Sequence, residues 1–387
     1  MNQGTGTPKV SAHISSGNLL RKLSVTDGVA GVIITARKAE NIGRVEKMYS
    51  LSDAESKGYT AEGEPFIYRF LYEFYLELGG NTELWLLGVE DTMTMEEMVE
   101  STHENGCKKL LTFSKGKINL VGVARHPNKG EEISGGFLDK DVENALLASK
   151  SLAEYQQSIN RPVRILIEGR IKDATSEDIF EPREAENTYA GVVLGSSRPD
   201  GSASLGTALA RACKYPAHIK LGNGQNGPLS LTQAYIGKQP IDEINPTELD
   251  NLSDAGYILM HTREGSAGYY FGIDNMAGTY DFRFLAHGRI IDKAQRVATA
   301  AATPFLETHM RMSREGEINA SDAKYLEETI KAQLNTSLVD QVSEVAVLVD
   351  IAQDLINTST LSIEVKVQPL GYLSWIRITL GLTTNTE

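Results

Sequence analysis

The sequence contains little cysteine. Only Cys107 and Cys213 occur among its 387 residues. Two cysteines are too few for a disulfide framework, and these two are too far apart in the sequence for a local metal-binding knuckle. Free cysteines are often simply buried, so we expect both to be inert thiols.

Long hydrophobic runs and a surplus of basic residues are also lacking. No apolar stretch approaches the roughly 18 residues that a membrane span needs, so we expect no direct membrane insertion. The first 18 residues are polar, without the basic start and apolar core of a secretory signal. We therefore expect a flexible N-terminal arm on a protein made inside the cell. The net charge of −13 argues against direct nucleic-acid binding, which needs surplus Lys and Arg to contact phosphates.

Motifs of known catalytic and metal sites are absent as well. There is no P-loop, no G-x-S-x-G and no H-E-x-x-H, residues 194–206 lack a G-x-G-x-x-G, and the glycine-rich stretch 221–228 has no clear junction with a helix and is expected to be a turn. We therefore expect no catalytic residues, no cofactor and no metal. Cys107 has His103 and Lys108 nearby, as a nucleophile would, but such neighbours are common by chance in a polar loop. For Asp274 and Asp292 we expect capping or ion-pairing roles rather than acid–base chemistry.

One segment is compatible with an enzyme, because it lies where such folds bind ligands. Residues 194–206, LGSSRPDGSASLG, follow an expected strand and precede an expected helix. Ligands of open α/β sheets bind at such junctions. The alternative function is therefore an α/β enzyme that binds a small anionic ligand near residues 194–206.

Short β-branched stretches and amphipathic stretches alternate along the first two thirds of the chain. We expect strands at 28–36, 84–89, 117–124, 163–169, 188–195, 256–260 and 269–273. We expect helices at 65–79, 141–160, 202–215 and 245–256. This alternation predicts an α/β fold (α+β overall), with a mixed sheet flanked by helices.

From about residue 282 the pattern changes to long helices, followed by closing strands. Helical stretches run to about residue 312 and again over 321–341, where Ser321 is a good N-cap residue. Apolar residues then alternate with polar ones at Ile363, Val365 and Val367, and again at Ile376, Ile378, Leu380 and Leu382. A period of two predicts half-buried strands. By periodicity alone, a hairpin folded onto its own domain is the commoner outcome.

The stretch 256–297 resembles contractile tail sheath proteins. In that family a strand pair precedes a helix that carries an R-[IV]-[IV]-D motif, here Arg289, Ile290, Ile291 and Asp292. The segments 204–216 and 252–258 are also similar, as is the closing order of two helices and two strands around a proline-containing turn. The resemblance covers residues 188–387, and the first third only in the order of elements.

The resemblance implies a structural, non-enzymatic subunit that polymerises helically around a tail tube. Contraction of the polymer would drive the tube through a target envelope. The implied organisation is an N-terminal linker arm (1–20), an α/β outer domain (21–281), an inner polymerisation domain (282–370, with a contribution from 21–36) and a C-terminal linker strand (371–387).

In that family the terminal segments leave the subunit and add to the sheets of neighbouring subunits. The linker residues implied here are Val10, Ala12 and Ile14 at the N-terminus, with Ile376, Ile378, Leu380 and Leu382 at the C-terminus. The implied partners are other copies of the chain, the tail tube protein, and baseplate and tail-terminator proteins. The implied location is a virion tail or a contractile injection particle assembled in the bacterial cytoplasm. A tail component that forms one closed ring is a further alternative.

Overall fold

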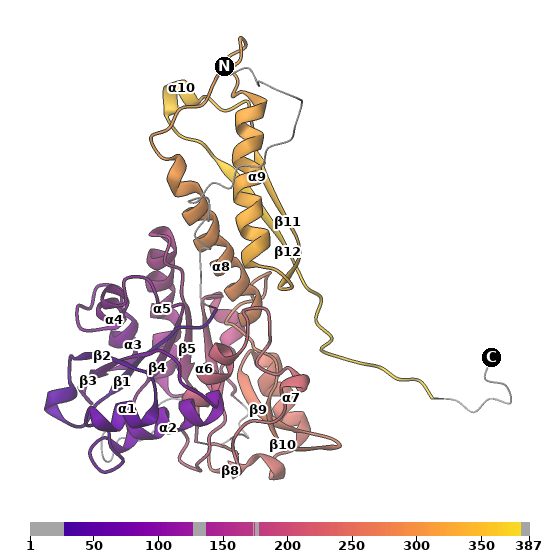
Figure 1. Cartoon of the computed structure of the whole chain (residues 1–387). Coiled ribbons are helices and arrows are strands. Elements are labelled where there is room, and N and C mark those ends of the chain that lie inside the picture. Colours follow the sequence, from indigo (N-terminus) through magenta and orange to yellow (C-terminus); the bar gives the residue numbers. More distant parts are fainter. Residues whose placement is uncertain (1–26, 127–136, 173, 175–177, 381–387) are drawn as a thin grey trace, which may run out of the picture.

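The protein is seen here in a computed structural model, which describes residues 27–126, 137–172, 174 and 178–380. A broad body surrounds an eight-stranded sheet, and a narrower part projects from it (Figure 1). Each part has its own hydrophobic core, one spanning Val29 to Leu285 and the other Ala294 to Val349. The expected mixed α/β architecture is confirmed. The domain boundaries themselves stay a prediction.

The large sheet has the strand order β10-β9-β6-β5-β4-β1-β3-β2. Its six central strands run parallel, while the edge strands β2 and β10 are antiparallel to their neighbours. The strands are β1 (Ala30–Thr35), β2 (Val45–Met48), β3 (Leu84–Val89), β4 (Leu120–Ala124), β5 (Arg164–Glu168), β6 (Ala190–Leu194), β9 (Ile258–Arg263) and β10 (Ser266–Phe271). Every residue of β1, β4, β5 and β6 is buried, as expected of parallel strands covered on both faces.

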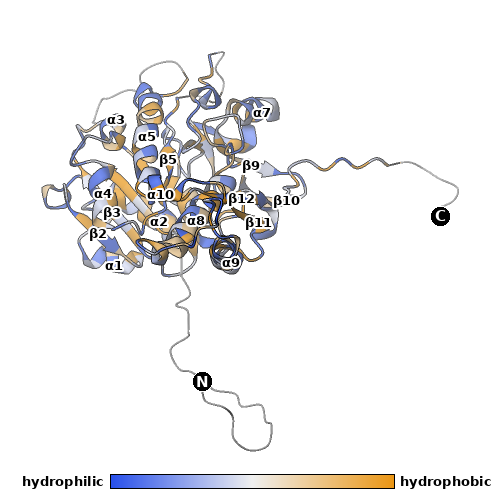
Figure 2. Cartoon of the chain, turned by 90° about the horizontal axis from the view of Figure 1, so that it is seen from above, coloured by the Kyte–Doolittle hydropathy of each residue, from blue (hydrophilic) through white to orange (hydrophobic). Residues whose placement is uncertain are grey.

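Helices cover both faces of this sheet, and hydrophobic residues concentrate between the layers (Figure 2). The helices of the body are α1 (Leu51–Ser56), α2 (Pro65–Leu78), α3 (Met95–Val99), α4 (Cys107–Phe113), α5 (Lys140–Ser158), α6 (Leu205–Lys214) and α7 (Pro246–Ala255). Short 3-10 turns are η1 (Ala39–Asn41), η2 (Pro182–Ala185), η3 (Gly224–Asn226) and η4 (Ile241–Glu243), and β7 (Tyr235–Ile236) pairs with β8 (Gln239–Pro240).

Helices α2 and α6 pack closely because α6 has a glycine where they meet. A Cβ atom on Gly206 would lie 2.5 Å from the carbonyl oxygen of Phe70. No side chain fits there without a backbone shift, so the two helices can approach this closely only at a glycine.

The projecting part consists of two long helices and a hairpin. They are α8 (Leu285–Ala302), α9 (Ala320–Ser337), β11 (Val342–Val349) and β12 (Ile363–Pro369), with the short η5 (Thr303–Phe305) and α10 (Leu355–Thr358). Helix α8 is shorter than the predicted stretch, because it tightens into η5 at Pro304 and stops. The predicted cap at Ser321 is wrong: the side chain of Asn319 accepts hydrogen bonds from the backbone N–H groups of Ser321 and Asp322.

Candidate functional site

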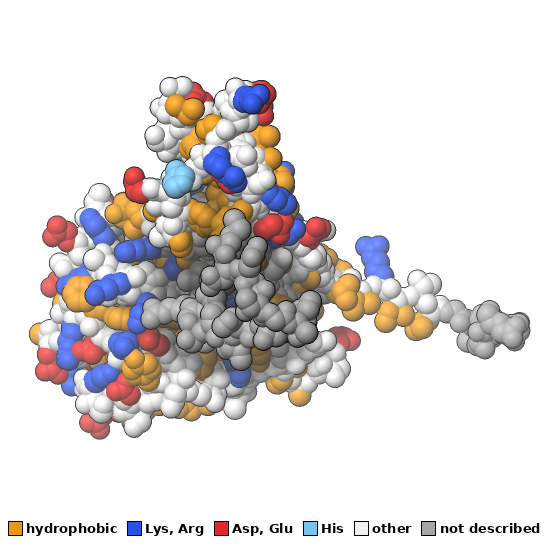
Figure 3. Space-filling view, turned by 45° about the horizontal axis from the view of Figure 1, so that its top comes forward, with side chains coloured by type: hydrophobic (Ala, Val, Ile, Leu, Met, Phe, Trp, Pro, Cys, Tyr) orange, Lys and Arg blue, Asp and Glu red, His pale blue; other side chains and the backbone are white. Residues whose placement is uncertain are grey.

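The chain beyond β12 leaves the molecule as an extended arm (Figure 1). Residues 370–380 belong to no helix or strand. The side chains of Ile376, Ile378 and Leu380 are 73%, 78% and 90% exposed, and hydrophobic side chains gather along the arm (Figure 3). Large aliphatic side chains that stand together in water mark an interaction segment. Leu382 lies outside the described residues, as do Val10, Ala12 and Ile14, so their linker role stays a prediction.

The hairpin of β11 and β12 is a sheet with two open edges. The two strands pair only with each other among the strands that the structure describes. A two-stranded sheet is marginal by itself, and unpaired edge groups attract a further strand. This sheet can therefore accept an extended segment along an open edge.

The predicted alternation is confirmed for Ile363, Val365 and Val367 in β12, but the partner of β12 is β11, and the described residues 370–380 do not form the predicted second strand. Val345 lies opposite Val367, Val347 opposite Val365, and Val349 opposite Ile363. These six side chains form one side of the smaller core, in which β11 packs against α9 and β12 against α8. The β11 members are buried and the β12 members only half-buried, so a strand added along β12 would remove further apolar surface from water.

The R-[IV]-[IV]-D motif on α8 holds the two parts of the chain together. The Arg164 guanidinium donates two hydrogen bonds of 2.7 Å to the carboxylate of Asp292, and both side chains are buried. Arg289 donates to the backbone oxygens of Asp27 and Tyr215. Ile290 is buried, and Ile291 packs on the smaller core. The expected ion-pairing role of Asp292 is confirmed.

Further polar contacts fix the same helix to the end of the large sheet. The Arg296 guanidinium donates to the backbone oxygens of Gly116, Ile118 and Pro162, next to the starts of β4 and β5. Asp274 accepts a 3.0 Å hydrogen bond from the N–H of Ala286 in the first turn of α8, which confirms its expected capping role. Helix α8 is thus fixed to the sheet at several points.

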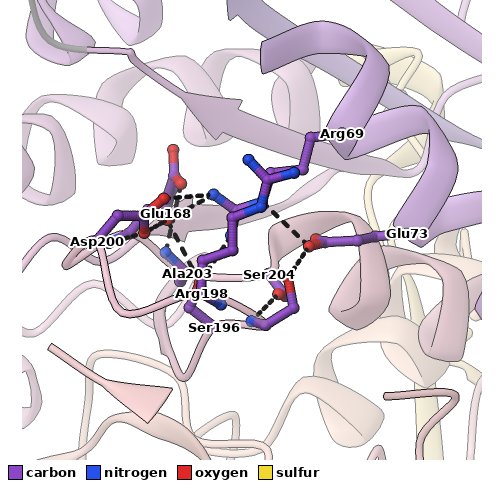
Figure 4. Close-up of polar contacts among 10 residues, drawn as sticks. Arg69, Glu73, Glu168, Ser196, Arg198, Asp200, Ala203 and Ser204 are labelled. Atoms are coloured by element: carbon purple, nitrogen blue, oxygen red, sulfur yellow. Dashed lines mark hydrogen bonds and ion pairs between the residues drawn. The ribbon is translucent and has the colours of Figure 1, made fainter. Parts of the chain in front are cut away.

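The segment 194–206 folds over a buried arginine on α2 (Figure 4). The Arg69 guanidinium donates to Ser196 Oγ at 2.7 Å, to Asp200 Oδ2 at 2.9 Å and to Glu73 Oε1 at 3.1 Å. The positive charge that could attract an anion is therefore already neutralised by carboxylates of the chain itself. The adjoining cavity measures about 10 Å³, about the space that one water molecule needs. The expectation of an anionic ligand at 194–206 is not supported by this geometry.

Glu168, at the end of β5, is buried beside this network. Its Oε1 atom accepts one 3.3 Å hydrogen bond from the N–H of Ala203, and its Oε2 atom has no hydrogen-bond partner among the described residues. Burial raises the pKa of the carboxyl from 4.5 to about 8, although Arg69 and Arg170 oppose the shift. Glu168 therefore carries a proton in the folded chain near neutral pH.

This raised pKa predicts a pH-dependent stability. Because the folded state holds a proton that the unfolded state releases above its ordinary pKa, the free energy of unfolding should fall as the pH rises from 4.5 to about 8. The slope that this proton contributes is at most about 1.4 kcal/mol per pH unit. Urea denaturation of Glu168→Gln across this range should show a smaller slope than that of the unmodified chain. Parallel curves for the two proteins would contradict the assignment.

The cysteines have no reactive character in the structure. Burial raises the pKa of the Cys107 and Cys213 thiols to about 12, so thiolate is scarce near neutral pH. Within the described ranges, no three His, Cys, Asp or Glu side chains gather as ligands for a metal ion. No helix in the same ranges is long and apolar enough to cross a membrane.

Sequence reasoning missed three residues on which this arrangement depends: Arg69, Arg164 and Tyr372, whose hydroxyl group donates a hydrogen bond to the backbone oxygen of His218. A signal existed for the first two. Arg69 lies within a strongly apolar helix, and Arg164 begins a buried strand, and a charge in such a place demands a partner. No comparable signal marked Tyr372.

Comparison with solved structures shows which proteins share this fold. The chain matches a chain of the anti-feeding prophage baseplate at 13% identity with a TM-score of 0.60, covering 98% of this chain and 100% of that chain. A chain of the contracted helical sheath of the anti-feeding prophage matches at 13% identity with a TM-score of 0.58 and the same coverage. The sheath tail protein of Desulfitobacterium hafniense matches at 10% identity with a TM-score of 0.54, covering 94% of this chain and 100% of that one.

The resemblance to sheath proteins is thereby confirmed at the level of the fold. It extends over nearly the whole chain, including the first third, where the sequence shows it only in the order of elements. No curated protein matches the sequence. Two family models do, "DUF2586, N-terminal domain" over residues 7–275 and "DUF2586, C-terminal domain" over residues 281–387. The chain belongs to the DUF2586 family.

Proposed function

We propose that this chain is a structural subunit of a contractile sheath, which polymerises helically around a tail tube. One observation carries the proposal. The same chain presents an exposed, apolar, extended arm and a two-stranded sheet with open edges, in a fold that it shares over 98% of its length with a chain of a contracted helical sheath.

The joint between subunits forms by strand addition. The arm of one copy lies along an open edge of the hairpin of another copy, and its backbone groups pair with the free N–H and C=O groups there. Each such hydrogen bond contributes about 0.5 to 1.5 kcal/mol net. Ile376, Ile378 and Leu380 alternate along the arm, so one face of the added strand is apolar. Residues 8–14, with Val10, Ala12 and Ile14 alternating, form the second arm.

Contraction is a rearrangement of rigid subunits that the arms keep connected. In this proposal the projecting part (282–370) carries the joints, and the body (21–281) lies outside it. No nucleotide is needed, because the free energy is stored in the extended arrangement of the subunits. The further partners are the tail tube, the baseplate and the tail-terminator proteins. The location is a virion tail or contractile injection particle, assembled in the bacterial cytoplasm.

A single closed ring is the second candidate, since a baseplate chain shares the fold as well. Negative-stain electron microscopy of the purified full-length chain distinguishes the two. Hollow cylinders built from stacked rings support the sheath subunit, whereas single rings support a baseplate or terminator component. Small particles whose melting temperature rises on addition of phosphate or nucleotides would favour a ligand-binding protein instead.

A further inference from the structure

One residue of the C-terminal arm is held by the body of the molecule. Tyr372 is half-buried, whereas Gly371 and residues 373–380 are exposed. Its hydroxyl group donates a 2.7 Å hydrogen bond to the backbone oxygen of His218, in the loop after α6. The next residue, Leu373, is 88% exposed, so the contact between the arm and the body ends immediately after the tyrosine.

The tyrosine ring lies on a cluster of aromatic and basic side chains. The Lys220 ammonium group is 4.8 Å from the centre of the Tyr372 ring and 3.5 Å from that of Phe284. The His287 ring, in the first turn of α8, lies 5.4 Å from the Tyr372 ring. Cation–π and ring contacts of this kind contribute to binding when the cation is withdrawn from water, and Lys220 is largely buried.

The carboxylate of Asp274 holds this cluster in place. The Lys220 ammonium group lies 3.6 Å from the carboxylate of Asp274, which also accepts the N–H of Ala286 in the first turn of α8. The position of the cation is therefore set by the carboxylate that caps α8. The cluster belongs to the body and to the base of α8, and not to the hairpin from which the arm comes.

We infer that Tyr372 is a positioning residue for assembly: it fixes on the body the point from which the C-terminal arm reaches a second copy of this chain. The inference rests on the proposed function. Because Tyr372 contacts the body and the first turn of α8, these elements rather than the hairpin determine the direction in which the arm leaves. From Tyr372 to Leu380 an extended chain spans about 26 Å, so the accepting edge of the second copy lies within about that distance.

The chain carries its own reporter for the first half of the test. It contains two tryptophans, and one of them, Trp375, lies three residues after the anchor. In a Trp85→Phe background, Trp375 is the one remaining tryptophan. Time-resolved anisotropy of its fluorescence, at a concentration too low for assembly, then reports the motion of the arm just after Tyr372. We expect Tyr372→Ala to lower the order parameter at Trp375 to below about 0.6, the range of flexible segments. Tyr372→Phe loses only the hydrogen bond to His218. Its order parameter at Trp375 should lie between those of Tyr372→Ala and the unmodified Tyr372. Leu373→Ala is the matched control and should leave the anisotropy unchanged.

Assembly is the second half of the test. Tyr372→Ala should raise the protein concentration needed for polymer formation about tenfold, a loss of about 1.4 kcal/mol per contact, with an unchanged melting temperature of the unassembled chain.

Unchanged anisotropy, or changed anisotropy with unchanged assembly, would overturn the inference. So would a lowered melting temperature, since the tyrosine would then be a folding residue only. If no variant assembles, the unmodified chain included, the proposed function fails, and the inference that depends on it falls too. The anisotropy then still shows whether the contact holds the arm.

Discussion

A chain that ends at Tyr372 should remain folded but fail to polymerise under conditions in which the full-length chain assembles. Residues 373–380 contribute nothing to either hydrophobic core, so their removal should leave the melting temperature unchanged. Assembly, in contrast, loses a whole strand. A few backbone hydrogen bonds at about 1 kcal/mol each and three aliphatic side chains at about 1.5 to 3 kcal/mol each when fully buried disappear from every joint. Analytical ultracentrifugation and negative-stain microscopy of both chains check this result.

Two single substitutions refine the same prediction, because they place one negative charge on opposite faces of the arm. Ile378→Asp puts a carboxylate on the apolar face with Ile376 and Leu380, where a buried charge without a partner is strongly unfavourable. Thr379→Asp puts it on the opposite face. We expect the first variant to abolish polymers and the second to retain them. Equal behaviour of the two variants would show that the arm does not bind as a strand with one buried face.

The second large effect concerns stability. Asp292→Ala should lower the free energy of unfolding by about 3 to 5 kcal/mol, the usual result of removing one partner from a buried ion pair. The reason is the arginine left behind. The side chain of Arg164 is only 2% exposed, and after the substitution its guanidinium keeps one hydrogen bond, to the backbone oxygen of Thr188. Urea denaturation followed by circular dichroism measures the difference, preferably in the chain that ends at Tyr372, where assembly does not interfere.

The matched control for this substitution is an ion pair on the surface. Lys38 and Glu40 lie 3.7 Å apart, with side chains 39% and 69% exposed. Glu40→Ala should change the free energy of unfolding by less than about 1 kcal/mol, because water screens such pairs. If Asp292→Ala were as mild as Glu40→Ala, the contact between α8 and β5 would not be what fixes the helix to the sheet.

Local pattern in the sequence was enough to predict most of the fold. The buried strands at 84–89 and 163–169 were visible as short apolar runs, and α2 and α7 as stretches that begin at a proline and stop at a glycine. Edge elements were harder. Strand β2, VEKM, has no apolar run, because it is only half-buried at the edge of the sheet, and the short helices α1, α3 and α4 have too few turns to show a period.

The sequence by itself determined the alternation of strands and helices, the alternating apolar face of β12, and the structural roles of Asp274 and Asp292. Each of these depends on spacing within a few residues. Only the tertiary structure decided that Asp292 pairs with Arg164, 128 positions away, that Asp200 neutralises Arg69 and fills a suspected ligand site, and that Tyr372 reaches the backbone of His218. These contacts join segments that are far apart in the sequence and meet only in the folded chain, and no local pattern records which charge will meet which partner.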